Sequence, residues 1–261
     1  MSMILVQIFR KTLFLMVWTL VFEVASLVPQ SGIPSKVAAQ DKEEAHYRIL
    51  REAMVKEQVS EPPDYRTPVR DKKVLDAMLA VPRHLFVNPS TLSMAYADNP
   101  LPIGYGQTIS QPYIVALMTE MLKIEPGHKV LEVGTGSGYH AAVLSHLAGE
   151  VYSVEIVESL GRRAAERLQN LGYHNIRVKV ADGYYGWNEH APFDCIIVTC
   201  AATLVPPPLI KQLKPGGKMC IPVGGQYAVQ HLTMVEKSEK GEITMRKTLP
   251  VRFVPLVRSS Q

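Results

Sequence analysis

The sequence of 261 residues predicts an α/β fold, in which a doubly wound and mostly parallel sheet carries helices on both faces. Two observations predict this fold. Strand-like and helix-like segments alternate between residues 129 and 223, and a glycine-rich loop stands where the first of these strands meets its helix. The length fits one large domain with an additional segment better than two full domains.

Helical patterns precede the alternation. Apolar residues recur at helical spacing between residues 43 and 59, and a proline pair then ends the helix. A second helix is predicted over residues 74–79, before an irregular, proline-rich stretch that ends at Gly106. A third helix is predicted from Pro112, because apolar residues fall at i, i+3, i+4, i+7 and i+8, namely Ile114, Leu117, Met118, Met121 and Leu122.

The alternating core follows this third helix. Five strands are predicted, over residues 129–133, 150–156, 176–181, 194–199 and 218–223. Helices are predicted over residues 139–148 and 158–171, the second capped by Gly172. After residue 225, two strand-like runs are joined by a Lys-Gly turn, at residues 229–235 and 243–249. They predict an antiparallel hairpin at the edge of the sheet.

The first 40 residues differ from the rest of the chain. Arg10 and Lys11 precede an uninterrupted apolar run over residues 12–22, and small residues follow at positions 37–39, which is the pattern of an export signal. The run is shorter than the roughly 20 residues that a membrane span needs. A membrane anchor and a start codon assigned too early both stay open as interpretations. Any membrane contact is therefore expected through residues 1–28.

Composition and charge exclude several classes of protein. With 47% hydrophobic and 20% charged residues, the chain is neither disordered nor collagen-like. The net charge of +4 is spread along the chain without a basic and aromatic tract, so we expect no nucleic-acid partner. The three cysteines imply no disulfide framework, and neither they nor the eight histidines show the spacing of metal ligands. No metal is expected.

The glycine-rich loop spaces its glycines as G-x-G-x-G, at Gly134, Gly136 and Gly138. Glycines let the backbone turn tightly and approach a ligand at the start of a helix. The spacing departs from the G-x-G-x-x-G of dinucleotide sites. Glu132 stands just ahead of it, where a carboxylate would repel a pyrophosphate but attract the cationic amino-acid part of S-adenosylmethionine. The loop therefore favours S-adenosylmethionine over NAD as the cofactor.

Two further acidic residues end neighbouring strands. Glu155 ends the second strand, where an acid can accept hydrogen bonds from both hydroxyls of a ribose. Asp182, followed by Gly183, closes the third strand and can place an acceptor near an adenine amino group. Each acid taken alone is equally well a solvated strand end. Open α/β sheets bind ligands at the carboxyl ends of their strands, so the three acids in this order predict one cofactor site.

Residues 96–112 resemble the signature that precedes the cofactor-binding core in protein-L-isoaspartate O-methyltransferases, and its specific part is the loop Gln107-Thr108-Ile109-Ser110. Shorter segments agree, at residues 80–87, 182–187, 191–194, 213–217 and 251–256. The resemblance covers about residues 43–257. It implies a class I, Rossmann-like enzyme that transfers a methyl group from S-adenosylmethionine to the carboxylate of L-isoaspartyl residues. Damaged proteins and peptides would be its partners, and methylation would start their repair through a succinimide.

This resemblance implies a single methyltransferase domain over residues 41–257, after a leader of residues 1–40. Its parts are a helical and substrate-loop region, a cofactor-binding core and C-terminal strands, over residues 41–111, 112–225 and 226–257, with a tail at 258–261. Two features depart from the family. Residues 60–70 replace a short arginine-glycine turn between the first two helices, and the leader has no counterpart in the common soluble form.

The resemblance makes Ser110 the candidate catalytic residue and Gln107, Thr108 and Ile109 its substrate-binding neighbours. A substrate carboxylate, with a pKa near about 4, is ionised at neutral pH, so its attack on a methyl sulfonium needs no general base. The attack needs alignment. Ser110 lies at the start of a helix, whose dipole attracts an anion, and its hydroxyl can hold one carboxylate oxygen. The other interpretation of Ser110 is a helix cap, worth about 1 kcal/mol.

Two other functions stay open. One is a class I methyltransferase that acts on a small molecule or nucleic acid, and the other is a non-catalytic module that binds S-adenosylmethionine or a modified peptide. Tyr184, Tyr185 and Trp187 are equally suited to stack on a ligand ring or to fill the core. We expect a monomer in the cytoplasm, where the cofactor is made, although the leader pattern would place the domain outside the membrane.

Overall fold

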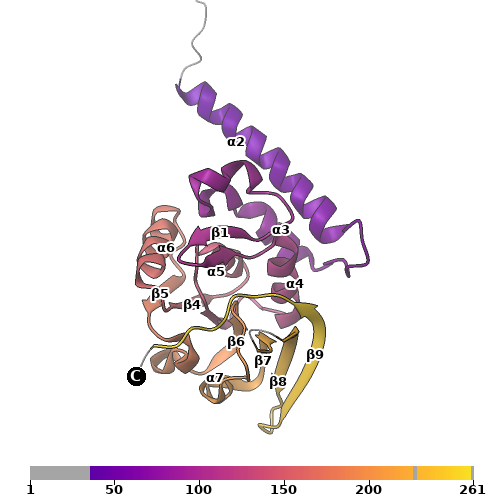
Figure 1. The fold of residues 1–261 in the computed structure, drawn as a ribbon, viewed down its shortest axis with the longest axis vertical. Coiled ribbons are helices and arrows are strands. Elements are labelled where there is room, and N and C mark those ends of the chain that lie inside the picture. The colour runs from indigo at the N-terminus through magenta and orange to yellow at the C-terminus, as the bar shows by residue number, and fades with distance from the viewer. Residues whose placement is uncertain (1–35, 226–227, 260–261) are drawn as a thin grey trace, which may run out of the picture. The chain divides into compact units, whose positions relative to one another are not determined.

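The computed structural model describes residues 36–225 and 228–259. Contacts divide the chain into two compact units, Met1–Ala45 and His46–Gln261. Helix α2 (Lys36–Ala53) begins in the first unit and ends in the second, where the π-helical turn η1 (Met54–Ser60) continues it (Figure 1). The predicted apolar run lies outside the described residues. None of the helices described is both long enough and apolar enough to cross a bilayer.

A seven-stranded sheet forms the centre of the second unit, in the order β5-β4-β3-β6-β7-β8-β9 (Figure 1). The strands are β3 (Lys129–Val133), β4 (Glu150–Glu155), β5 (Ile176–Val180), β6 (Phe193–Val198), β7 (Leu213–Val223), β8 (Gln230–Lys237) and β9 (Ile243–Val251). Strands β3 to β7 are parallel, whereas β8 pairs antiparallel with β7 and β9 antiparallel with β8. The predicted sheet and its C-terminal hairpin are confirmed.

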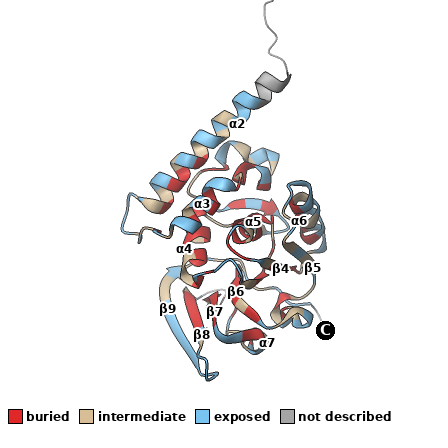
Figure 2. Cartoon of the chain, turned by 180° about the vertical axis from the view of Figure 1, so that it is seen from behind, coloured by how far each residue is buried: buried red, intermediate tan, exposed pale blue. Residues whose placement is uncertain are grey.

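Both faces of the parallel strands β3, β4 and β6 are buried. Val130 and Val151 pack on one side with helices α4 (Pro112–Leu122), α5 (Tyr139–Ser145) and α6 (Glu158–Asn170). Their neighbours in sequence, Leu131 and Tyr152, pack on the other side with α7 (Pro207–Gln212). Burial on both faces explains why these strands appear in the sequence as apolar runs. The edge strand β9 is largely exposed (Figure 2).

Three elements differ from the prediction. The stretch predicted as irregular, which ends at Gly106, contains β1 (Leu101–Gly104), and β1 forms an antiparallel hairpin with β2 (Gln107–Ile109), which follows the stretch. Its strands are too short to show periodicity, and its turn uses positive φ angles at Gly104, Tyr105 and Gly106. Helix α7, which was not predicted, has only six residues and begins with two prolines. Strand β7 begins five residues before the strand predicted over residues 218–223. The remaining helical elements are α3 (Lys72–Ala80), η2 (Arg83–Phe86) and η3 (Pro89–Met94).

Candidate active site

The strand ends enclose a cavity of about 50 Å³ at the point where the strand order reverses, between β3 and β6. Open α/β sheets bind their ligands at this point. Residues that the sequence predicts for the site gather here, and the lining includes Gln107, Thr108, Gly134, Gly136, Glu155 and Gly183. Residues 254–257 form another wall, because the chain after β9 passes back across the strand ends (Figure 1). Hydrogen bonds between Ala201 and both Val254 and Leu256 hold this segment in place.

The glycine loop packs tightly against β6. Gly134 has a φ of +99°, and a Cβ there would lie 2.4 Å from the Thr199 Oγ1 atom. The Thr199 hydroxyl donates a hydrogen bond of 2.7 Å to the Gly134 carbonyl. Gly138, with a φ of +88°, begins helix α5. Glycine is therefore required at Gly134 by both conformation and space.

Glu155 holds the other side of the loop. One of its carboxylate oxygens accepts a hydrogen bond of 2.8 Å from the Gly136 amide, and the other accepts one of 2.9 Å from the Val157 amide. The side chain is buried but lines the cavity. A carboxylate oxygen can accept more than one hydrogen bond. Glu155 therefore stabilises the loop and still has acceptor capacity directed at the cavity.

Glu132 lies beneath the loop and does not line the cavity. Its side chain is fully buried, and it accepts a short hydrogen bond from the Ser153 hydroxyl. The Ser153 hydroxyl is also hydrogen-bonded to the Thr135 hydroxyl, with 2.5 Å between the two oxygens. The second Glu132 oxygen has no hydrogen-bond partner among the described residues. Burial raises the pKa of Glu132 to about 8. In this structure Glu132 reaches the loop through a hydrogen-bonded chain of Ser153 and Thr135, and its contact with the cofactor stays a prediction.

This raised pKa makes the free energy of unfolding depend on pH. The folded state binds an extra proton between the usual pKa of 4.5 and about 8, so wild-type stability falls as the pH rises through that range. Glu132→Gln removes the titrating group. We expect the variant to gain stability relative to wild type between about pH 5 and about pH 8, measured by urea unfolding at both values. Parallel pH dependences would show that Glu132 does not titrate there.

Asp182 is held by the C-terminal tail. One of its oxygens accepts from the Tyr184 amide at 3.0 Å, and the other accepts from Arg258 Nε at 3.0 Å and the Ser259 amide at 3.2 Å. Partial burial raises the pKa of Asp182, but these hydrogen bonds outweigh it and lower the pKa. Gly183 faces the cavity, whereas Asp182 is not part of its lining. An adenine amino group would have to share this carboxylate with the tail.

The aromatic residues near Asp182 were predicted either to stack on a ligand ring or to fill the core, and they differ in this respect. Trp187 packs edge-on against Tyr152, with ring centroids 5.4 Å apart, and is partly buried against the core. The Arg258 guanidinium lies 3.6 Å from the centroid of the Tyr184 ring, and Tyr185 is 47% exposed. Tyr184 is therefore already stacked on a cation of its own chain.

Ser110 lines a second cavity, of about 30 Å³, that also touches Gly134, Gly136 and Thr199. Its hydroxyl makes no hydrogen bond with any described residue. The N-cap of α4 is Gln111, and no side chain caps this helix. The interpretation of Ser110 as a helix cap is therefore wrong. Its hydroxyl is free at the cavity, next to the helix that was predicted to attract an anion.

Two buried residues near Ser110 were missed as site residues by the sequence analysis. Arg83 is fully buried, donates hydrogen bonds to the carbonyls of Ser110 at 2.8 Å and Ala95 at 2.9 Å, and makes no ion pair with a described residue. His140 lines the second cavity, and burial lowers its pKa to about 3. A lone arginine in a short helical turn leaves no periodic signal, so only its place in the family-like segment of residues 80–87 could have indicated it.

The His140 ring has a defined tautomer. The Thr119 hydroxyl donates to the Val115 carbonyl at 2.7 Å, so the 2.9 Å contact with His140 requires the Nε2 atom to donate. The Nδ1 atom is then an acceptor, and it has no partner among the described residues. Within the same described part of the chain, no three His, Cys, Asp or Glu residues are grouped to hold a metal ion.

Comparison with known proteins agrees with this geometry. The family model for protein-L-isoaspartate(D-aspartate) O-methyltransferase matches residues 55–261. A protein-L-isoaspartate O-methyltransferase 2 of Polaromonas sp. is 60% identical over 189 residues, which cover 72% of this chain and 90% of that protein. One of Shewanella sediminis is 47% identical over 247 residues, 94% of this chain and 95% of that protein.

Solved structures give the same result. A protein-L-isoaspartate O-methyltransferase superimposes with a TM-score of 0.67 at 30% identity, covering 81% of this chain and 65% of that one. A Plasmodium falciparum structure, described as a putative enzyme of this kind in complex with S-adenosyl-L-homocysteine, superimposes with a TM-score of 0.67 at 25% identity over 81% of this chain and 98% of that one. This chain belongs to the protein-L-isoaspartate(D-aspartate) O-methyltransferase family.

Proposed function

We propose that this protein transfers a methyl group from S-adenosylmethionine to the carboxylate of L-isoaspartyl residues in damaged proteins and peptides. The methyl ester then leads through a succinimide to repair. One observation carries the assignment to this site: the glycine loop and Glu155 share a cavity with Gln107 and Thr108 of the family's substrate loop. A cofactor and a substrate bound on these two sides would meet at Gly134 and Gly136.

The residues around the cavity fit the cofactor chemically. Glu155 would accept hydrogen bonds from the ribose hydroxyls, and Ile156 and Gly183 would flank the adenine. Gly134, Gly136 and Gly138 would bring the backbone close to the amino-acid part. When bound, S-adenosylmethionine supplies a methyl group on a positively charged sulfur. Ligand pockets usually measure at least about 300 Å³, so the cavity must widen to admit it.

The reaction requires orientation and not a general base. The substrate carboxylate is already ionised, and its oxygen forms a bond to the methyl carbon as the bond between that carbon and sulfur breaks. Both charges disappear and no proton moves. Ser110, with its free hydroxyl, would hold one carboxylate oxygen in line, while the N-terminus of α4 attracts the negative charge. Arg83 would fix the loop backbone through the Ser110 carbonyl.

We propose that the protein acts in the cytoplasm, because the methyl donor is made and held there. We also propose that it is a monomer and has no nucleic-acid partner. The export-like leader instead favours a location outside the membrane. The alignment with the Shewanella protein covers more of this chain than follows residue 40, so it extends into the leader. Cell fractionation combined with N-terminal sequencing distinguishes cytoplasmic from exported protein.

Paired peptides that differ only in aspartate or isoaspartate at one position test the proposed function. With labelled S-adenosylmethionine, the isoaspartyl peptide should be methylated at least about 100-fold faster. The aspartyl peptide lacks the extra backbone methylene of isoaspartate, so its carboxylate is misplaced for in-line attack. Equal rates would favour a methyltransferase with another substrate. Cofactor binding without methylation of either peptide would favour a non-catalytic module.

A further inference from the structure

Residues 60–70, the segment that departs from the family pattern, are anchored at their C-terminal end. The Val69 amide donates to the Val59 carbonyl at 3.1 Å, and the Val69 side chain is fully buried. The amides of Arg70 and Asp71 both donate to one Glu120 oxygen of helix α4, at 2.7 Å. This segment is therefore fixed to the helix that begins two residues after Ser110.

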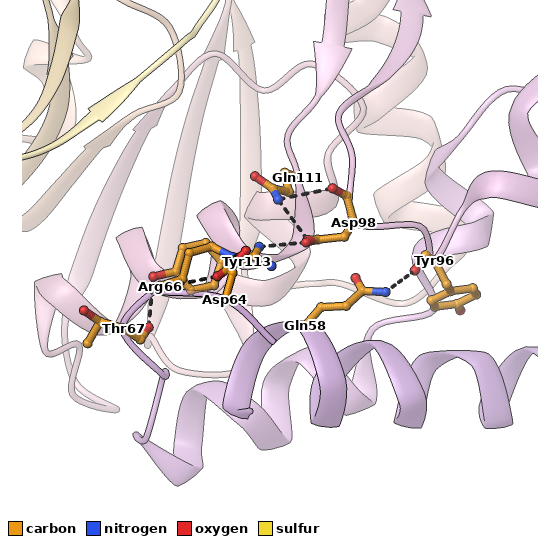
Figure 3. A network of polar contacts seen from close by, with 8 residues as sticks. All are labelled: Gln58, Asp64, Arg66, Thr67, Tyr96, Asp98, Gln111 and Tyr113. Carbon is orange, nitrogen blue, oxygen red and sulfur yellow. Dashed lines mark hydrogen bonds and ion pairs between the residues drawn. The ribbon is translucent and has the colours of Figure 1, made fainter. Parts of the chain in front are cut away.

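Arg66 is the centre of a network between this segment and the substrate loop (Figure 3). Its Nε atom pairs with Asp64 of the same segment at 2.8 Å, and its Nη1 atom pairs with Asp98 at 2.7 Å. The guanidinium lies 4.8 Å from the centroid of the Tyr113 ring, and the Tyr113 hydroxyl donates to the Thr67 carbonyl at 2.9 Å. The Arg66 side chain is only 16% exposed. It is thus held from three sides.

Asp98 and Gln111 stand at the two ends of the β1–β2 hairpin. The Gln111 side-chain amide donates to the Asp98 carboxylate at 2.9 Å and to the Asp98 carbonyl at 3.2 Å (Figure 3). One Asp98 oxygen therefore accepts from Gln111, and the other pairs with Arg66. Gln111 directly follows Ser110 in the chain. Arg66, Asp98 and Gln111 thus form a polar chain that ends beside the free hydroxyl.

We propose that Arg66 is a positioning residue for methyl transfer, which fixes the base of the β1–β2 hairpin through Asp98 and so the backbone at Ser110. This inference rests on the proposed function. Arg66 lines neither of the two cavities and would not touch the substrate or the cofactor. A displacement of about 1 Å at a reacting group can cost up to about 100-fold in rate, so a looser hairpin base would reduce turnover of the peptide. Cofactor affinity would stay the same.

The test compares Arg66→Met and Arg66→Lys with wild type and with the control Arg162→Met. Arg162 pairs with Glu158 at the same 2.7 Å on the exposed face of α6. We expect Arg66→Met to lower kcat/KM for the isoaspartyl peptide roughly 10-fold, and Arg66→Lys to restore part of it. The Kd for S-adenosylhomocysteine, measured by calorimetry, should stay within about twofold for both variants. The melting temperature of Arg66→Met should fall, because Asp98 loses its partner in a largely buried pair, whereas Arg66→Lys keeps the charge and should stay within about 3 °C of wild type. Arg162→Met should retain wild-type kinetics.

A double-mutant cycle with Asp98→Asn separates positioning from general stabilisation. If Arg66 acts through Asp98, the double variant should be no slower than the slower single variant. Wild-type kcat/KM in Arg66→Met, or losses that multiply in the double variant, would overturn the inference. A wild-type enzyme that leaves the isoaspartyl peptide unmethylated would instead refute the proposed function. If Arg66→Met fails to fold, Arg66→Lys and Asp98→Asn supply the same comparison.

Discussion

Ser110→Ala should lower kcat for the isoaspartyl peptide roughly 10- to 150-fold, which corresponds to the loss of one hydrogen bond to a charged group, about 1.5 to 3 kcal/mol. Methylation should persist, because the hydroxyl orients an ionised carboxylate and transfers no proton. The melting temperature should not change. The Ser110 hydroxyl makes no hydrogen bond with a described residue, and the N-cap position of α4 is occupied by Gln111 and not by Ser110.

Rate and melting temperature measured on one preparation test this expectation. Ser145→Ala is the matched control, since the Ser145 hydroxyl donates to the Ala142 carbonyl at 2.7 Å within α5 and lines neither cavity of the site. That variant should keep the wild-type rate. A Ser110→Ala enzyme that is destabilised but fully active would remove Ser110 from the site.

Glu155→Ala should weaken S-adenosylmethionine binding by about 1 to 3 kcal/mol, or roughly 5- to 150-fold in Kd. The substitution removes the acceptor proposed for the ribose. It also releases the amides of Gly136 and Val157, so the glycine loop loses one of its hydrogen bonds to β4. Calorimetric titration measures the change directly.

Glu150→Ala supplies the control for this titration. Glu150 begins the same strand, at the end away from the cavity, where it contacts Arg177 at 3.5 Å. Its replacement should leave the Kd unchanged. If Glu155→Ala also binds the cofactor with wild-type affinity, the assignment of Glu155 to the ribose is wrong.

The sequence predicted the part of the molecule in which local pattern and tertiary role agree. The strands β3, β4 and β6 are buried on both faces, so their apolar runs appear directly in the sequence. The glycine loop was found because Gly134, Gly136 and Gly138 all need positive φ angles, which leave a readable spacing. Glu155 was placed at the cavity because it is the last residue of its strand.

The rest depends on contacts between distant segments. Glu132 precedes the loop in the sequence, but strand alternation and the hydrogen bond from Ser153 place it beneath the loop. The tail contact of Asp182 joins residues 76 positions apart, and the Arg83 contact with Ser110 joins residues 27 positions apart. No local pattern encodes such pairs. The β1–β2 hairpin was missed because its strands have four and three residues.

The central claim is that a preoriented, already ionised carboxylate attacks without a general base, and the pH dependence of kcat tests it most directly. With saturating S-adenosylmethionine and isoaspartyl peptide, the rate should stay flat from about pH 6 to about pH 8. Among the described groups that support the glycine loop, Glu132 has its pKa raised by burial to about 8, close to this range, so Glu132→Gln is measured beside the wild type. The account predicts a flat profile for both enzymes. A steep rise across this range in both would mean that an enzyme base must lose a proton, and would contradict it.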